Sequence, residues 1–159
     1  MEAAGRLVAC LGAEGLVIAL VGPLGVGKTV FAKGLAQGLG IPPDLVASPT
    51  FAIASEYRST GGRIFAHVDV YRLESAAELD ATGFLDLLEP GNLVAVEWAD
   101  RFPEALPADR LQVQLERGQA PPGEASVVER QRSLNAVASG PVSRAVLDLW
   151  DQAMGSRGG

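Results

Sequence analysis

The chain has 159 residues, of which 48% are hydrophobic, and a formal net charge of −6 at pH 7. This length predicts one domain with a buried core, and the negative charge disfavours a protein that coats nucleic acid, which would need clustered lysine and arginine. A single cysteine, Cys10, and the lack of an apolar run long enough to cross a bilayer predict a cytoplasmic protein without a membrane segment.

A strand, a glycine-rich loop and a helix are predicted in succession near the N-terminus. A short helix is expected over residues 3–12, and the continuous apolar run at 16–21 predicts a buried strand. Apolar residues then recur at helical spacing from Phe31 until Gly40 ends the pattern. Between strand and helix, residues 22–29 match the phosphate-binding pattern G-x-x-x-x-G-K-[ST], which requires this order of elements.

This loop predicts a nucleotide site. In such a loop backbone N–H groups cradle the phosphates, the lysine (Lys28) reaches the β and γ groups, and the hydroxyl of Thr29 binds Mg²⁺. The following helix points the positive end of its dipole at the phosphates. We expect nucleotide contacts from the loop and the first helical turn, namely Gly22, Leu24, Gly25, Val26, Gly27, Lys28, Thr29 and Val30.

A hairpin and a capped helix are predicted next. Residues 51–57 and 63–70 flank a Thr-Gly-Gly turn signal and predict two antiparallel strands. Ser75 and Glu78 form a capping box that begins a helix, and Gly83 interrupts that helix.

Two acidic residues stand where strands are predicted to end. Asp69 follows an apolar stretch, and Glu97 follows the apolar strand predicted over residues 93–96. Ligands of open α/β sheets bind beyond the carboxyl ends of strands, so Asp69 is a candidate Mg²⁺ ligand and Glu97 a candidate general base beside the metal. The two could exchange roles. The alternative interpretations are a surface acid for Asp69 and an ion pair with Arg101 for Glu97.

Four other side chains are weaker candidates. Thr50 lies in a proline-containing connection that could sense the γ-phosphate, although a local hydrogen bond is the usual role of such a threonine. Trp98 could flank the nucleotide or pack in the core. His67 is interpreted as structural, and Arg72 could pair with phosphate or with Asp69.

The C-terminal third predicts a second pair of strands and a terminal helix. Residues 111–115 alternate apolar and polar, residues 117–124 form a loop, and residues 125–138 are expected to return as a strand. A helix is predicted over residues 141–154, and residues 155–159 are expected to be a disordered tail.

Four short motifs, in this order and spacing, resemble the TsaE (YjeE) family. They are residues 22–29, 48–51, 67–73 and 97–98, and the resemblance covers roughly residues 5–138. The family is the bacterial ATPase required for the N6-threonylcarbamoyladenosine modification of tRNA. The family often has an acidic residue at the position of Pro23, Ala at that of Val26 and Pro at that of Ala99, and the helix at 141–154 lies outside its pattern.

The resemblance implies an α/β single-domain P-loop NTPase fold over residues 1–154, with a mixed, partly antiparallel central sheet flanked by helices. It implies binding of ATP or ADP with Mg²⁺ and slow hydrolysis by the protein alone. The functional residues implied by position are Lys28 as a phosphate ligand and catalytic residue, Thr29 and Asp69 on the metal, Thr50 in a switch-like loop, and Glu97 with Trp98 beside the nucleotide.

The resemblance also implies partners. The family joins TsaB and TsaD, and TsaD transfers the threonylcarbamoyl group to an adenosine next to the anticodon. The ATPase resets this complex between turnovers, so contact with tRNA is expected to be indirect or weak.

Two other enzyme classes use the same loop. A small-molecule kinase is the main alternative, but it usually needs an arginine-rich lid, and the arginines between residues 100 and 145 are scattered. A regulatory GTPase is disfavoured because the chain lacks an Asn-Lys-x-Asp segment. A non-enzymatic, nucleotide-gated binding subunit overlaps the leading interpretation, because hydrolysis could act by changing an exposed surface.

Overall fold

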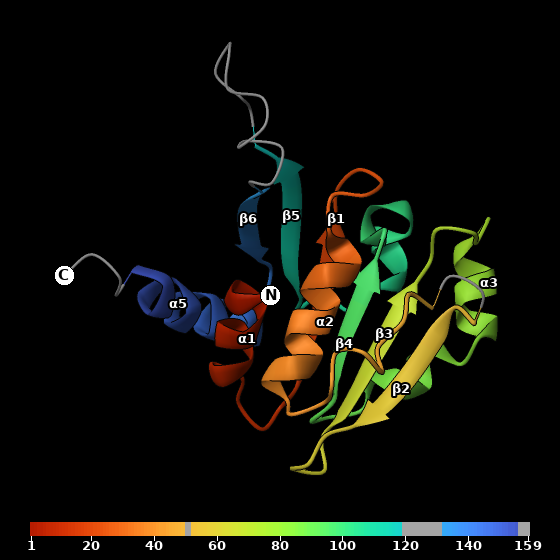
Figure 1. Cartoon of the computed structure of the whole chain (residues 1–159). Helices are drawn as coiled ribbons and strands as arrows, with labels where there is room; N and C mark the ends of the chain where they lie inside the picture. The colour runs from red at the N-terminus through yellow and green to blue at the C-terminus, as the bar shows by residue number, and fades with distance from the viewer. Residues whose placement is uncertain (50–51, 119–131, 156–159) are drawn as a thin grey trace.

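Six strands form one sheet in the computed structural model, which describes residues 1–49, 52–118 and 132–155. The strand order is β2-β3-β4-β1-β5-β6 (Figure 1). The strands are β1 (Leu16–Val21), β2 (Ala54–Arg58), β3 (Ile64–Asp69), β4 (Leu93–Glu97), β5 (Leu111–Arg117) and β6 (Arg132–Ala138).

The centre of the sheet is parallel and both edges are antiparallel. β1 lies between β4 and β5 and is parallel to both, and β3 is parallel to β4. β2 pairs antiparallel with β3, and β6 pairs antiparallel with β5. The predicted mixed, partly antiparallel sheet is therefore confirmed. All four parallel strands end at the same edge, where a ligand is expected.

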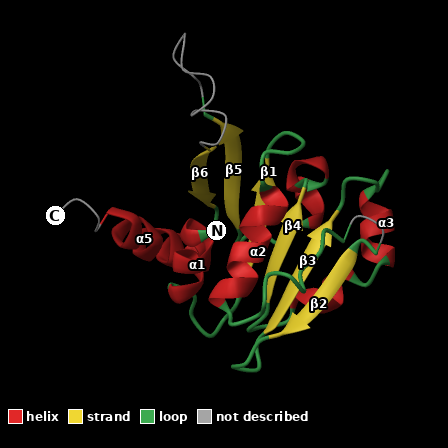
Figure 2. Ribbon diagram, viewed as in Figure 1, coloured by secondary structure: helices red, strands yellow, loops and turns green. Residues whose placement is uncertain are grey.

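Helices cover both faces of the sheet (Figure 2). The α-helices are α1 (Glu2–Ala9), α2 (Lys28–Gly38), α3 (Ala76–Ala81) and α5 (Pro141–Gly155), and the 3₁₀-helices are η1 (Phe84–Leu88), η2 (Ala99–Arg101) and η3 (Pro103–Ala105). Residues of α1, α2 and α5 pack on one face with Ile18 and Leu20 of β1. α3 and the 3₁₀-helices pack on the other face with Val17 and Ala19, as the alternation of a strand requires.

Most predicted elements are present, with shifted ends. α1 ends at Ala9, before the predicted end at residue 12, and β5 continues to Arg117. β2 begins only at Ala54 because Ile53 has a φ of 63°, which a strand cannot accommodate. As predicted, the chain leaves the α3 helix at Gly83, which has a positive φ.

Some predictions lie outside the described residues. These are the switch-like role of Thr50, the strand start at residue 51, residues 119–124 of the loop predicted over 117–124, residues 125–131 of the strand predicted over 125–138, and residues 156–159 of the predicted tail. In the described part of the chain no helix is both long and apolar enough to cross a membrane.

Candidate nucleotide site

A cavity of about 360 Å³ lies at the carboxyl edge of the sheet. The loop after β1, the start of α2, and the ends of β3 and β4 form its walls. Its lining includes Lys28, Thr29, Asp69, Glu97 and Trp98. The sequence predicted a functional role for all five, and the fold brings them together.

The glycine-rich loop packs tightly between β5 and the core. A Cβ at Gly22, where φ is 144°, would lie 2.4 Å from the carbonyl oxygen of Leu115, so only glycine fits there. Val26 is 1% exposed and its side chain belongs to the core, so it can contribute to a ligand site only through its backbone. Leu24 and Val30 are exposed beside the cavity.

Lys28 is buried and folds back on its own loop. Its Nζ donates to the carbonyl oxygens of Gly22 (2.6 Å) and Pro23 (3.0 Å), and it lies 3.6 Å from the centre of the Trp98 ring. Burial lowers the pKa of the Lys28 ammonium, and nearby carboxylates, of which Glu97 has the largest effect, oppose this shift. A phosphate would have to compete with these contacts for the ammonium.

Trp98 has an unusual backbone conformation at the end of β4. Its φ of 61° lies in the left-handed region, which costs a residue with a Cβ of order 1 kcal/mol. In this conformation the indole contacts both Lys28 and the ring of Tyr71, whose centre is 4.8 Å away. The strain is stored beside the cavity, as often occurs at functional sites.

Glu97 connects α2 to the sheet. Its Oε1 accepts from Thr29 Oγ1 at 2.7 Å and lies 2.8 Å from His67 Nε2, and both Glu97 and His67 are buried. An ionised carboxylate can only accept, so the His67 ring donates from Nε2. In the described residues His67 Nδ1 has no hydrogen-bond partner. The arrangement fixes one oxygen of a buried carboxylate from two sides.

Asp69 stands beside Glu97 in the register of β3 and β4. Its Oδ1 accepts from the backbone N–H of Tyr71 at 2.9 Å, and Ser48 Oγ is 3.4 Å from its Oδ2. Alternation along β3 places His67 and Asp69 on the same face, which α2 covers. Two buried carboxylates thus lie side by side below the N-terminus of α2.

The geometry distinguishes among the sequence-based interpretations. The alternative ion pair between Glu97 and Arg101 is not formed, because Arg101 Nη2 donates to the carbonyl of Leu73 at 2.7 Å. Of the two acids, Glu97 accepts a hydrogen bond from Thr29, and Asp69 has the Tyr71 N–H and Ser48 among its partners. His67 has a contact with Glu97 that the sequence interpretation missed, although its position two residues before Asp69 indicated a shared face.

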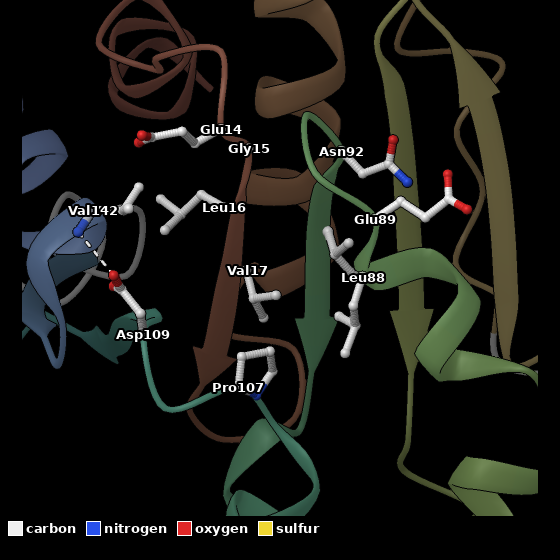
Figure 3. A pocket seen from close by; sticks show the side chains of 11 residues that line it. Glu14, Gly15, Leu16, Val17, Leu88, Glu89, Asn92, Pro107, Asp109 and Val142 are labelled. Carbon is white, nitrogen blue, oxygen red and sulfur yellow. Dashed lines mark hydrogen bonds between the residues drawn. The ribbon is translucent and has the colours of Figure 1, made fainter.

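A second cavity, of about 190 Å³, lies at the opposite edge, where β1 and β4 begin (Figure 3). In the described part of the chain its charged lining residues are Glu14, Glu89 and Asp109, and no described lysine or arginine lines it. Asp109 accepts from the N–H of Val142 (2.8 Å), as the dashed line shows, and so caps α5. Its carboxylates would repel phosphate, so the cavity at the carboxyl edge is the better candidate for a nucleotide site.

Comparisons with known proteins agree on one family. The sequence model of a family described as "Threonylcarbamoyl adenosine biosynthesis protein TsaE" matches residues 1–126. The chain is 41% identical over 116 residues to the tRNA threonylcarbamoyladenosine biosynthesis protein TsaE of Bacillus subtilis, which covers 73% of this chain and 71% of that protein. The chain is also 38% identical over 118 residues to the protein of the same description from Streptomyces coelicolor. The match covers 74% of this chain and 79% of that protein.

A solved structure has the same fold. The crystal structure of Bacillus subtilus YdiB superposes with a TM-score of 0.68 and 30% sequence identity, covering 96% of this chain and 88% of that one.

Proposed function

The chain belongs to the TsaE family of threonylcarbamoyl adenosine biosynthesis proteins, and we propose that it acts in this pathway as a Mg²⁺-dependent ATPase. One observation carries the proposal. A phosphate-binding loop, a threonine hydroxyl and two buried carboxylates from separate strands line one cavity at the carboxyl edge of the sheet. This is the set of groups that nucleotide hydrolysis needs.

The donor set fits Mg²⁺, which prefers oxygen ligands. Thr29 Oγ1 donates to Glu97 Oε1 at 2.7 Å, so a hydroxyl and a carboxylate oxygen that could both hold Mg²⁺ lie side by side. We assign the metal side of the site to Thr29 and Glu97, with Asp69 next to them. A bound Mg²⁺ would neutralise phosphate charge that these carboxylates would otherwise repel.

The remaining roles follow from charge and position. Lys28 binds the β and γ phosphates after its ammonium leaves the loop carbonyls, and it stabilises charge on the transferred group. Asp69 then orients the attacking water, and its contact with Ser48 connects it to the segment predicted to respond to the γ-phosphate. This is the exchanged assignment of the two acids that the sequence left open.

Matched variants separate these two acidic roles. Glu97→Gln is expected to raise the Mg²⁺ concentration needed for ADP binding, whereas Asp69→Asn should keep Mg²⁺-dependent binding and lose hydrolysis. The reverse pattern would return Asp69 to the metal and Glu97 to the water.

We further propose that the nucleotide state of the chain controls its binding to TsaB and TsaD and so resets that complex. A pull-down with purified TsaB and TsaD, in Mg²⁺–ATP and in Mg²⁺–ADP, tests this. We expect retention to differ between the two nucleotides. Equal retention in both would contradict the switch, and stimulation of phosphate transfer by a metabolite with no partner bound would favour the small-molecule kinase.

A further inference from the structure

The β5–β6 hairpin holds the phosphate-binding loop through two arginines. Arg117, the last residue of β5, donates from Nη2 to the carbonyl oxygen of Leu24 at 3.2 Å. Arg132, the first residue of β6, donates from Nε to the carbonyl oxygen of Val26 at 2.9 Å. In Figure 1 the ends of both strands lie beside the loop that follows β1.

These bonds determine the direction of two backbone N–H groups. The chain has no cis peptide in its described parts, so the N–H of each residue points opposite to the carbonyl before it. The carbonyl of Leu24 points to Arg117, so the N–H of Gly25 points away from that arginine. Likewise, the carbonyl of Val26 points to Arg132, so the N–H of Gly27 points away from that arginine. Backbone N–H groups that converge on an anion form the anion-binding nest of a phosphate loop.

The hairpin is a firm support for such a task. β5 and β6 pair along their whole lengths, with Arg117 directly opposite Arg132. Residues directly opposite in an antiparallel pair point to the same face, so the two like charges repel each other at some cost. Their carbonyl acceptors in the loop offset this cost. β5 also contacts the loop through its backbone, where the Leu115 carbonyl excludes a side chain at Gly22.

We propose that Arg117 and Arg132 are positioning residues that preorganise the loop for the β-phosphate of a nucleotide, an inference that rests on the proposed nucleotide binding. They act from the side of the loop carbonyls and do not line the cavity that holds Lys28. Arg132 lies beyond residue 126, where the match to the family sequence model ends. The hairpin thereby sets the phosphate affinity of the loop.

The test is the binding of Mg²⁺–ADP to the full chain by titration calorimetry. Arg117→Ala and Arg132→Ala should each weaken ADP binding about threefold to tenfold, the effect of one hydrogen bond. ATP should lose the same factor, and the loss should persist in roughly 0.5 M salt because it does not arise from long-range attraction. Arg58→Ala is the matched control, since Arg58 also donates to a carbonyl, that of Gly62, far from the loop.

A residue-specific readout accompanies the affinities. In ¹⁵N-labelled protein, Arg117→Ala should shift the amide signal of Gly25 most and Arg132→Ala that of Gly27. Unchanged ADP affinity with a loss of hydrolysis alone would overturn the proposal, because the arginines would then act on the transferred phosphate. A loss that disappears at high salt would also overturn it. Failure of the unmodified chain to bind ADP would instead contradict the proposed function.

Discussion

The contact between His67 and Glu97 allows a stability measurement that needs no nucleotide. Both side chains are buried, and Glu97 Oε1 is 2.8 Å from His67 Nε2. A hydrogen bond to a charged group contributes about 1.5–3 kcal/mol. His67→Leu removes the donor and leaves a buried carboxylate with Thr29 as its remaining side-chain donor in the described chain.

A double-mutant cycle isolates this contact. His67→Leu also removes the unpartnered Nδ1, which favours the variant, and Glu97→Leu also breaks the bond to Thr29. Each of these side effects occurs in both backgrounds of the cycle and cancels. We expect a coupling energy of about 2 kcal/mol. In a chain of this size, a change of that size in the free energy of unfolding shifts the melting temperature by about 4–8 °C.

Chemical denaturation of the four proteins, in EDTA and without nucleotide, measures the coupling. His67→Gln should recover part of the stability because its amide can donate to the same carboxylate. A coupling energy below about 0.5 kcal/mol would refute the argument that His67 fixes Glu97.

Three further predictions concern the loop and the opposite edge of the sheet. Burial lowers the pKa of Lys28, so its ammonium should lose its proton at a lower pH than an ordinary lysine, whose pKa is about 10.4. ADP affinity should therefore begin to fall below that pH. An ADP affinity that stays constant as the pH rises to about 10.4 would contradict this prediction. Gly22→Ala should destabilise the chain by more than about 1 kcal/mol, because its Cβ would meet the Leu115 carbonyl. Gly62 also has a positive φ, but a Cβ there would meet no described atom within 4 Å, so Gly62→Ala should cost less. Asp109→Ala should cost about 1 kcal/mol at neutral pH, measured by urea unfolding. Desolvation acts to raise the pKa of Asp109, but the hydrogen bonds from α5 outweigh it and lower that pKa, so this stability is present above the unfolded-state pKa and is lost as pH falls through the folded value. An Asp109→Ala deficit that stays constant down to roughly pH 2 would contradict the capping role.

The sequence was most informative where a local pattern determines the structure. The run at Leu16–Val21, the glycines after it and the helical spacing beyond Lys28 are each explained by their own residues, and all three elements form as predicted. Asp69 and Glu97 could be placed at one edge because parallel strands share a direction.

Other features depend on register, which a single sequence does not reveal. The pairing of His67 with Glu97 requires β3 and β4 to be aligned as they are, with Asp69 opposite Glu97. The contacts of Arg117 and Arg132 with the loop require both the register of β5 with β6 and the reach of the hairpin past the end of β1. The positive φ of Trp98 has no sequence signal, because a tryptophan at that position predicts an ordinary backbone.

The most direct test of ATP hydrolysis at this loop compares steady-state release of phosphate from Mg²⁺–ATP between the unmodified chain and Lys28→Ala. Lys28 reaches the cavity but is no part of the sheet, so the variant is expected to fold, as its circular dichroism should show. We expect slow turnover by the unmodified chain and none by the variant. Equal turnover by both proteins would contradict it.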